Sequence, residues 1–108
     1  MSKKFLLHAK FNAKGVSGLL KSGGTARRQV ANKMIHDLGG KLESLNFTLN
    51  ADEAYAIFEL PDDLSAAAIS LNVEATGMAG INLIQLFTPS DIDTAAGILV
   101  DYRPPGKE

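Results

Sequence analysis

The sequence predicts an α+β fold in which a four-stranded antiparallel sheet carries helices on one of its faces. Three segments alternate apolar and polar residues, as strands do: residues 4–11, 41–60 and 81–87. Two intervening segments repeat apolar residues every three or four positions, as helices do: residues 12–38 and 61–75. Because the middle strand segment is long enough to fold back as a hairpin, the predicted order is β-α-β-β-α-β in a single domain of 108 residues.

The first predicted strand covers Lys4–Phe11. Its apolar residues occupy alternate positions and are expected to face the helices: Phe5, Leu7, Ala9 and Phe11. His8 and Lys10 would then lie on the opposite face. A short helix is expected over 12–21, from the helical spacing of Val16, Leu19 and Leu20.

A second helix is predicted to begin at Thr25, after Gly23-Gly24 interrupts the first, because glycine is costly inside a helix. One side of it is apolar: Ala26, Val30, Met34 and Leu38, with Ala31 and Ile35 beside them. Gly39-Gly40 is expected to end this helix through a left-handed cap.

A β-hairpin is predicted from Lys41–Leu49 and Ala54–Leu60, which alternate and lie only a few residues apart. The reversal between them reads Asn50-Ala51-Asp52-Glu53. It suits a tight turn because asparagine tolerates a positive φ and aspartate bonds its own backbone.

The second half of the chain has clear helix starts. Pro61-Asp62-Asp63 supplies an acidic cap for a helix whose expected buried side is Leu64, Ala67, Ala68, Leu71 and Ala75. A fourth strand is expected over Ile81–Phe87. Thr88-Pro89-Ser90-Asp91 then begins a short helix, and residues 99–108 are predicted to form an extended tail.

The βαββαβ order is the ferredoxin-like arrangement. The stretches LGGKLESLNFTLNADEAYAIFELPDD and LIQLFTPSDID resemble the GYD-domain family, and GGTARR and YRPPG resemble one recurring subgroup of it. The naming motif is not retained, since Asn50-Ala51-Asp52-Glu53 stands where the family typically has Gly-Glu-Tyr-Asp. The resemblance implies a ferredoxin-like fold of the dimeric α/β-barrel kind and a family without a settled biochemical activity.

Composition excludes several function classes. Eleven basic and 12 acidic residues give a net charge of −1, which does not favour nucleic acid as a partner. The chain has no cysteine, which removes disulfides and thiolate sites and fits a cytoplasmic protein. The apolar run at the start ends at His8 and Lys10, too short for a signal peptide or a membrane span, so no membrane partner is expected. Two histidines are too few for a metal site, and no cofactor is expected.

The first candidate site is the sheet face away from the helices. There His8 would share a surface with Tyr55 and Glu59, and with the residues Ser44, Asn46, Thr48 and Ile57. If a second subunit closes this face, His8 could act as a general acid or base, with Tyr55 and Glu59 orienting it or a substrate. The alternative is a polar subunit interface in which His8 is simply hydrogen-bonded.

The second candidate is an anion site at Gly23, Gly24, Thr25, Arg27 and Arg28. Backbone N–H groups at a helix start bind phosphate or carboxylate, and arginines near the positive end of a helix dipole need a compensating partner. The alternative is that the glycines only separate two helices and the arginines pair with acids of a neighbouring helix or subunit.

These features leave three hypotheses in order of preference. The first is a non-catalytic module that assembles with itself, as a homodimer or larger, and holds a small molecule or another protein. The second is a cofactor-independent enzyme acting on a small apolar substrate, with His8 as acid-base. The third is anion binding at residues 23–28. In the first, Tyr102-Arg103-Pro104-Pro105 could cross onto a partner subunit or remain a loose end.

Overall fold

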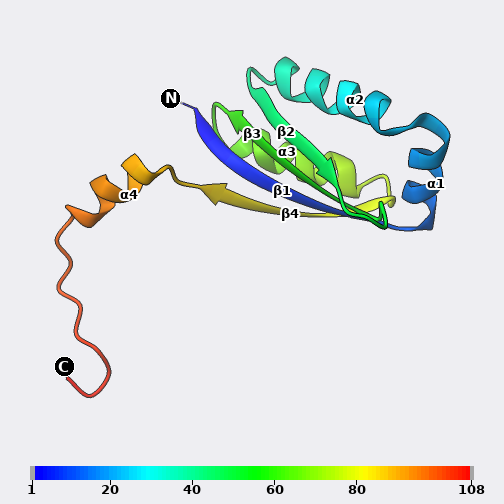
Figure 1. The fold of residues 1–108 in the computed structure, drawn as a ribbon. Helices are drawn as coiled ribbons and strands as arrows, with labels where there is room; N and C mark the ends of the chain where they lie inside the picture. The colour runs from blue at the N-terminus through cyan, green and yellow to red at the C-terminus, as the bar shows by residue number, and fades with distance from the viewer. Residues whose placement is uncertain (1, 108) are drawn as a thin grey trace.

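The computed structural model describes residues 2–107 and contains one sheet with helices on one face (Figure 1). The elements in chain order are β1 (Lys3–Phe11), α1 (Ala13–Ser22), α2 (Gly24–Asp37), β2 (Lys41–Phe47), β3 (Glu53–Leu60), α3 (Asp63–Glu74), β4 (Ala79–Leu86) and α4 (Pro89–Ala96). This order confirms the predicted α+β, ferredoxin-like class.

The strands pair in the order β2-β3-β1-β4, and every neighbouring pair is antiparallel. β1 lies between β3 and β4, so that Phe5 is opposite Phe58 and His8 is opposite Tyr55. A register shift between Leu42 and Ser44 places a bulge in the edge strand β2. The pairing puts the apolar residues of β1 on the helix side and His8 on the other side, as the alternation predicts.

The core lies between the sheet and the helices α2 and α3. Its largest fully buried side chains are Phe58, Ile35 and Leu60, and the rings of Phe5 and Phe58 lie 6.0 Å apart. Alanines occupy three further buried positions of the sheet: Ala9, Ala54 and Ala56. Because an alanine fills little of the space above a strand, the centre of the sheet is thinly covered.

Glycine positions set the ends of the helices, as the sequence predicts. Gly23 ends α1 and precedes α2 with a φ of 83°, a conformation open to glycine at little cost. At the other end of α2, Gly39 has a φ of 83° and its N–H donates to the carbonyl of His36 at 2.9 Å. The Gly40 N–H donates to the carbonyl of Ile35 at 2.9 Å, which completes a left-handed Schellman cap.

The predicted hairpin is present, but its turn begins at Thr48, two residues before the predicted Asn50-Ala51-Asp52-Glu53. The residue with a positive φ is Ala51, at 60°. The Ala51 N–H donates to the carbonyl of Thr48 at 2.9 Å, which closes a β-turn with Leu49 and Asn50 at its centre. Ala51 is therefore the last residue of the turn, and Glu53 already belongs to β3.

The predicted buried side of α3 is wrong. Leu64 and Leu71 are exposed, whereas Ala66 and Ile69 are buried and Val73 packs beside them. Both sides of this helix are apolar, so periodicity alone does not choose between them. The start of the helix is as predicted: the Ser65 N–H donates to the Asp62 carboxylate at 2.8 Å, and this hydrogen bond lowers the pKa of Asp62.

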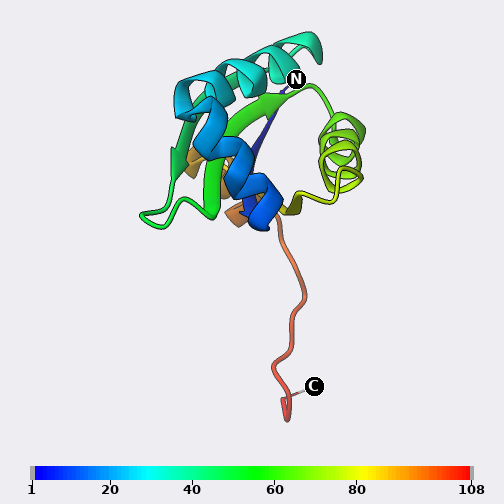
Figure 2. The same cartoon turned by 90° about the vertical axis from the view of Figure 1, so that its right-hand side faces the viewer.

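The C-terminal part leaves the body of the molecule. A capping box between Thr88 and Asp91 starts α4, which extends away from the sheet, and the following tail leads further from the body (Figures 1 and 2). The radius of gyration, 17.4 Å, exceeds the ~13 Å of a compact chain of this length. We call residues 87–107 the arm. Within residues 2–107, no helix is both long and apolar enough to cross a membrane.

Candidate functional site

The sheet face away from the helices, here called the open face, is organised in rows that run across the strands. One row is apolar and combines Ile57, Leu6 and Ile84 on three adjacent strands. The next row is polar and combines Asn46, Tyr55, His8 and Asn82. Charged rows lie on either side: Lys41, Glu59 and Lys4 at one end, and Glu53 and Lys10 at the other. The open face is thus a mixed surface with an apolar centre.

His8 forms the closest polar contact of this face. Its Nε2 lies 2.6 Å from Oε1 of Glu53, and the two side chains are 23% and 30% exposed. A ring N–H at Nε2 that donates to the carboxylate leaves Nδ1 as an acceptor. Glu53 therefore orients the imidazole in the way that an acid-base histidine requires.

Tyr55 and Glu59, the other predicted residues of this site, are placed differently from each other. Tyr55 stacks on His8 with 4.8 Å between ring centroids. Glu59 lies four residues further along β3, ~13 Å away at the rise of a strand, where it accepts a hydrogen bond from Ser2 at 2.9 Å and is opposite Lys4. Glu59 therefore does not contact His8. The carboxylate beside His8 belongs to Glu53, and not to Glu59 as predicted.

Gly23, Gly24, Thr25, Arg27 and Arg28 lie on the helix side, so the sheet separates them from His8. They form the joint and the first turn of α2, which has no side-chain cap and no acidic residue in that turn. Among residues 2–107, neither Arg27 nor Arg28 has an ion-pair partner. The predicted acids of a neighbouring helix are therefore not found within the described chain.

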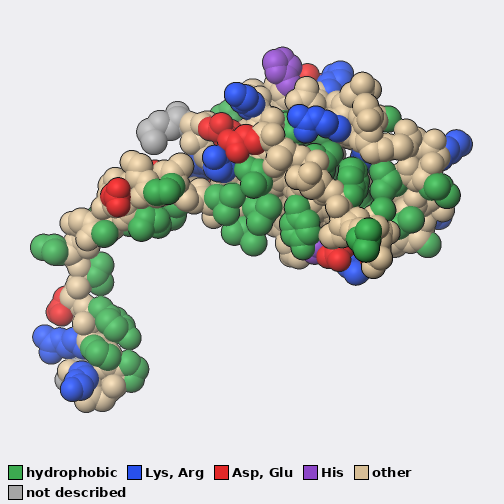
Figure 3. Space-filling view, viewed as in Figure 1, with side chains coloured by type: hydrophobic (Ala, Val, Ile, Leu, Met, Phe, Trp, Pro, Cys, Tyr) green, Lys and Arg blue, Asp and Glu red, His purple; other side chains and the backbone are tan. Residues whose placement is uncertain are grey.

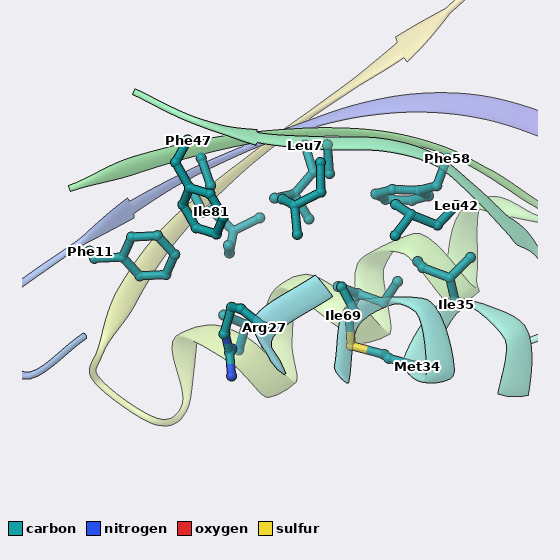
Figure 4. Close-up of a pocket in the computed structure, with 16 residues that line it drawn as sticks. Leu7, Phe11, Arg27, Met34, Ile35, Leu42, Phe47, Phe58, Ile69 and Ile81 are labelled. Atoms are coloured by element: carbon teal, nitrogen blue, oxygen red, sulfur yellow. The ribbon is translucent and has the colours of Figure 1, made fainter. Parts of the chain in front are cut away.

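A pocket lies between the sheet and α2 and α3 (Figure 4), and we call it the helix-side pocket. Side chains of the sheet, such as Leu7 and Phe58, line it from one side, and Met34 and Ile69 of the two helices line it from the other. Its volume is about 80 Å³. Among the described residues that line it, Arg27 alone is charged.

A family model described as the GYD domain matches residues 5–96. The chain belongs to the GYD-domain family. No curated protein and no solved structure gives a significant match to the chain. The matched residues run from β1 to the end of α4, so both His8 and the helix-side pocket lie within the GYD domain, and the tail after α4 lies outside the match.

The sequence reasoning missed two features of this GYD-domain protein. Glu53 was assigned to a turn, whereas it begins β3 and is the diagonal neighbour of His8 across the strand pair. The helix-side pocket was missed as well. The signal for it is the run of alanines at alternate positions of two paired strands, Ala9 on β1 and Ala54 and Ala56 on β3.

Proposed function

We propose that this GYD-domain protein is a non-catalytic module of the cytoplasm that assembles with copies of itself through the open face and the arm. The observation that carries the proposal is the set of large apolar side chains that the chain leaves uncovered. In the arm these are Phe87, Ile92, Ile98, Leu99, Val100 and Tyr102, between 54% and 97% exposed. Figure 3 shows apolar side chains along the whole arm, which touches little of the body.

The arrangement of the open face supports pairing between identical copies. One charged row borders the apolar row and carries both signs of charge, so two copies related by a twofold axis can place Lys4 or Lys41 near Glu59 of the other. Scattered apolar residues are normal on a surface, but a contiguous row together with an uncovered arm is typical of an interaction site. Closure of two such faces would give the dimeric α/β barrel.

Assembly can be tested with a charge at the centre of the apolar row. We expect Ile84→Glu to weaken self-association by at least tenfold, because Ile84 is 53% exposed in one chain and a buried unpaired carboxylate is costly. Sedimentation velocity over a range of concentrations measures the change. Leu20→Glu is the matched control on α1, since Leu20 is 88% exposed and lies away from the open face. A monomeric wild type, or equal effects of the two variants, would contradict the proposal.

The contact between His8 and Glu53 favours a second candidate function, a cofactor-independent enzyme acting on a small apolar substrate. Nδ1 of His8 would accept a proton from a carbon or oxygen acid, and Glu53 would hold the imidazolium that forms. Ile57 and Ile84 in the next row provide the apolar surface that such a substrate needs. A partner subunit across the open face would exclude water from the site.

This second function predicts proton exchange catalysed by the protein. In D2O, acetophenone is a small apolar probe whose methyl protons exchange with base catalysis, and proton NMR follows their loss. We expect wild type to exceed the buffer rate by about a hundredfold if His8 is the base, and His8→Gln to abolish the excess. Lys10→Gln, on the same face, is the control and should retain it. A wild-type rate equal to that of the buffer would remove this candidate.

A further inference from the structure

The helix-side pocket exists because small side chains meet where two helices diverge. Ala9, Ala54 and Ala56 floor it on the sheet, and Ala31 faces them from α2. α2 and α3 both contact the sheet but barely contact each other. Figure 2 shows them apart, with α2 at the top and α3 at the right. A leucine or valine at any of these alanines would fill much of the hollow. The cavity is therefore a consequence of residue choice.

Two grooves of the helix layer share lining residues with the pocket. One, of about 480 Å³, runs between Val30 and Leu38 of α2 and Ile69 of α3. The other, of about 390 Å³, runs past Leu19 of α1 and Val73 of α3. Met34 lines the pocket and both grooves. The shared residues place the three hollows next to one another, and we call the pocket and the two grooves together the channel.

Arg27 is the charge at the mouth of this channel. Its carbon chain lines the pocket, and its nitrogen atoms point away from the sheet (Figure 4). The other cation of the rim, Lys33, is already paired with Asp37 at 2.6 Å, whereas Arg27 has no ion pair within residues 2–107. An apolar channel that ends at one unpaired guanidinium is complementary to a ligand with an apolar tail and a single anionic head.

We propose that the helix-side pocket binds a straight-chain carboxylic acid, with the carboxylate on Arg27 and the alkyl chain between α2 and α3. The guanidinium and the carboxylate match as a bidentate pair, which fixes the head of the ligand. Binding of the alkyl chain removes apolar surface of the ligand and of the pocket from water. An apolar pocket also accepts hydrocarbon more readily than water. The 80 Å³ of the pocket holds part of the alkyl chain, and the rest of the chain lies along the adjoining groove of about 390 Å³, which Arg27 also lines.

The test uses decanoate as the probe and isoleucine methyl NMR as the readout. Ile35, Ile69 and Ile81 line the pocket, whereas Ile57 and Ile84 lie on the open face. We expect saturable binding of one decanoate per chain, with shifts at the first group and none at the second. Shifts confined to the open face, or no shift at millimolar decanoate, would overturn the proposal.

Arg27→Gln and Arg28→Gln form the matched pair, because Arg28 is adjacent but does not line the pocket. We expect Arg27→Gln to weaken decanoate binding by at least tenfold and Arg28→Gln by less than twofold. Decanol should bind wild type at least tenfold more weakly than decanoate, and the two should bind the Arg27→Gln variant alike. Equal losses in the two variants would show a diffuse basic surface and would contradict a site at Arg27.

A larger side chain in the pocket provides an independent check of where the alkyl chain of the ligand lies. Ala31 lines the pocket, and Ala31→Leu should weaken decanoate binding at least tenfold. Ala67→Leu, at an exposed position of α3, should leave decanoate binding unchanged. Unchanged binding to Ala31→Leu would overturn the placement of the alkyl chain. The pocket and the open face lie on opposite sides of the sheet, so this result is separable from assembly. A monomer that binds decanoate here would contradict only the proposed assembly.

Discussion

Replacing Gly40 by alanine is expected to destabilise the fold by ~3 kcal/mol, at the upper end of the cost of overpacking a core. A Cβ at this position would overlap the backbone carbonyl oxygen of Glu59 and would lie 2.8 Å from Cδ2 of Leu60 and 3.1 Å from Cγ2 of Ile35. The obstacle is mainly backbone of the central sheet, which cannot move aside as a flexible side chain can. Urea unfolding followed by circular dichroism measures the loss as a lower midpoint.

Gly18→Ala is the control for this experiment. Gly18 lies within α1, and a Cβ there would meet nothing within 4 Å. The same change should therefore raise the free energy of unfolding by ~0.5–1 kcal/mol, because alanine is the better helix former. If the two variants unfold at the same urea concentration, α2 and β3 are not packed as closely at Gly40 as the structure indicates.

The parts of the fold that were predicted correctly depend on local chemistry. Gly39 and Gly40 end α2, and Thr88 and Asp91 start α4, because each cap is made by residues only a few positions apart. The alternation of β1 likewise places His8 without knowledge of its partners. The buried side of α3 depends instead on how the helix sits against the sheet, and Leu71 is as apolar as Ile69.

The candidate site was only partly predictable, for the same reason. Alternation places His8 and Tyr55 on the same face, but they meet only because β1 and β3 pair in one particular register, which alternation does not give. Glu53 was missed because its role depends on where β3 begins, a boundary that sequence patterns define poorly. The helix-side pocket depends on the separation of α2 and α3, and no short stretch of sequence encodes that distance.

The largest expected effect on assembly comes from the arm. Replacing Ile98, Leu99 and Val100 together by serine should raise the dissociation constant of the assembly by about a thousandfold, since burying such side chains is worth ~1.5–3 kcal/mol each and only part of that needs to be realised. The three side chains are 65%, 97% and 77% exposed in one chain. Native mass spectrometry and sedimentation velocity at matched concentrations measure the change.

The control replaces Leu20 and Leu71 by serine, since these leucines are 88% and 72% exposed but lie on α1 and α3. Generic surface hydrophobicity would make both sets of substitutions weaken association equally, whereas an arm that crosses to a second copy makes only the first set do so. At concentrations where the protein is monomeric, the arm variant should have the same free energy of unfolding as the control variant. The reason is that no residue of the arm belongs to the core around Phe58. An arm variant that still assembles like wild type would place the interface on the open face alone.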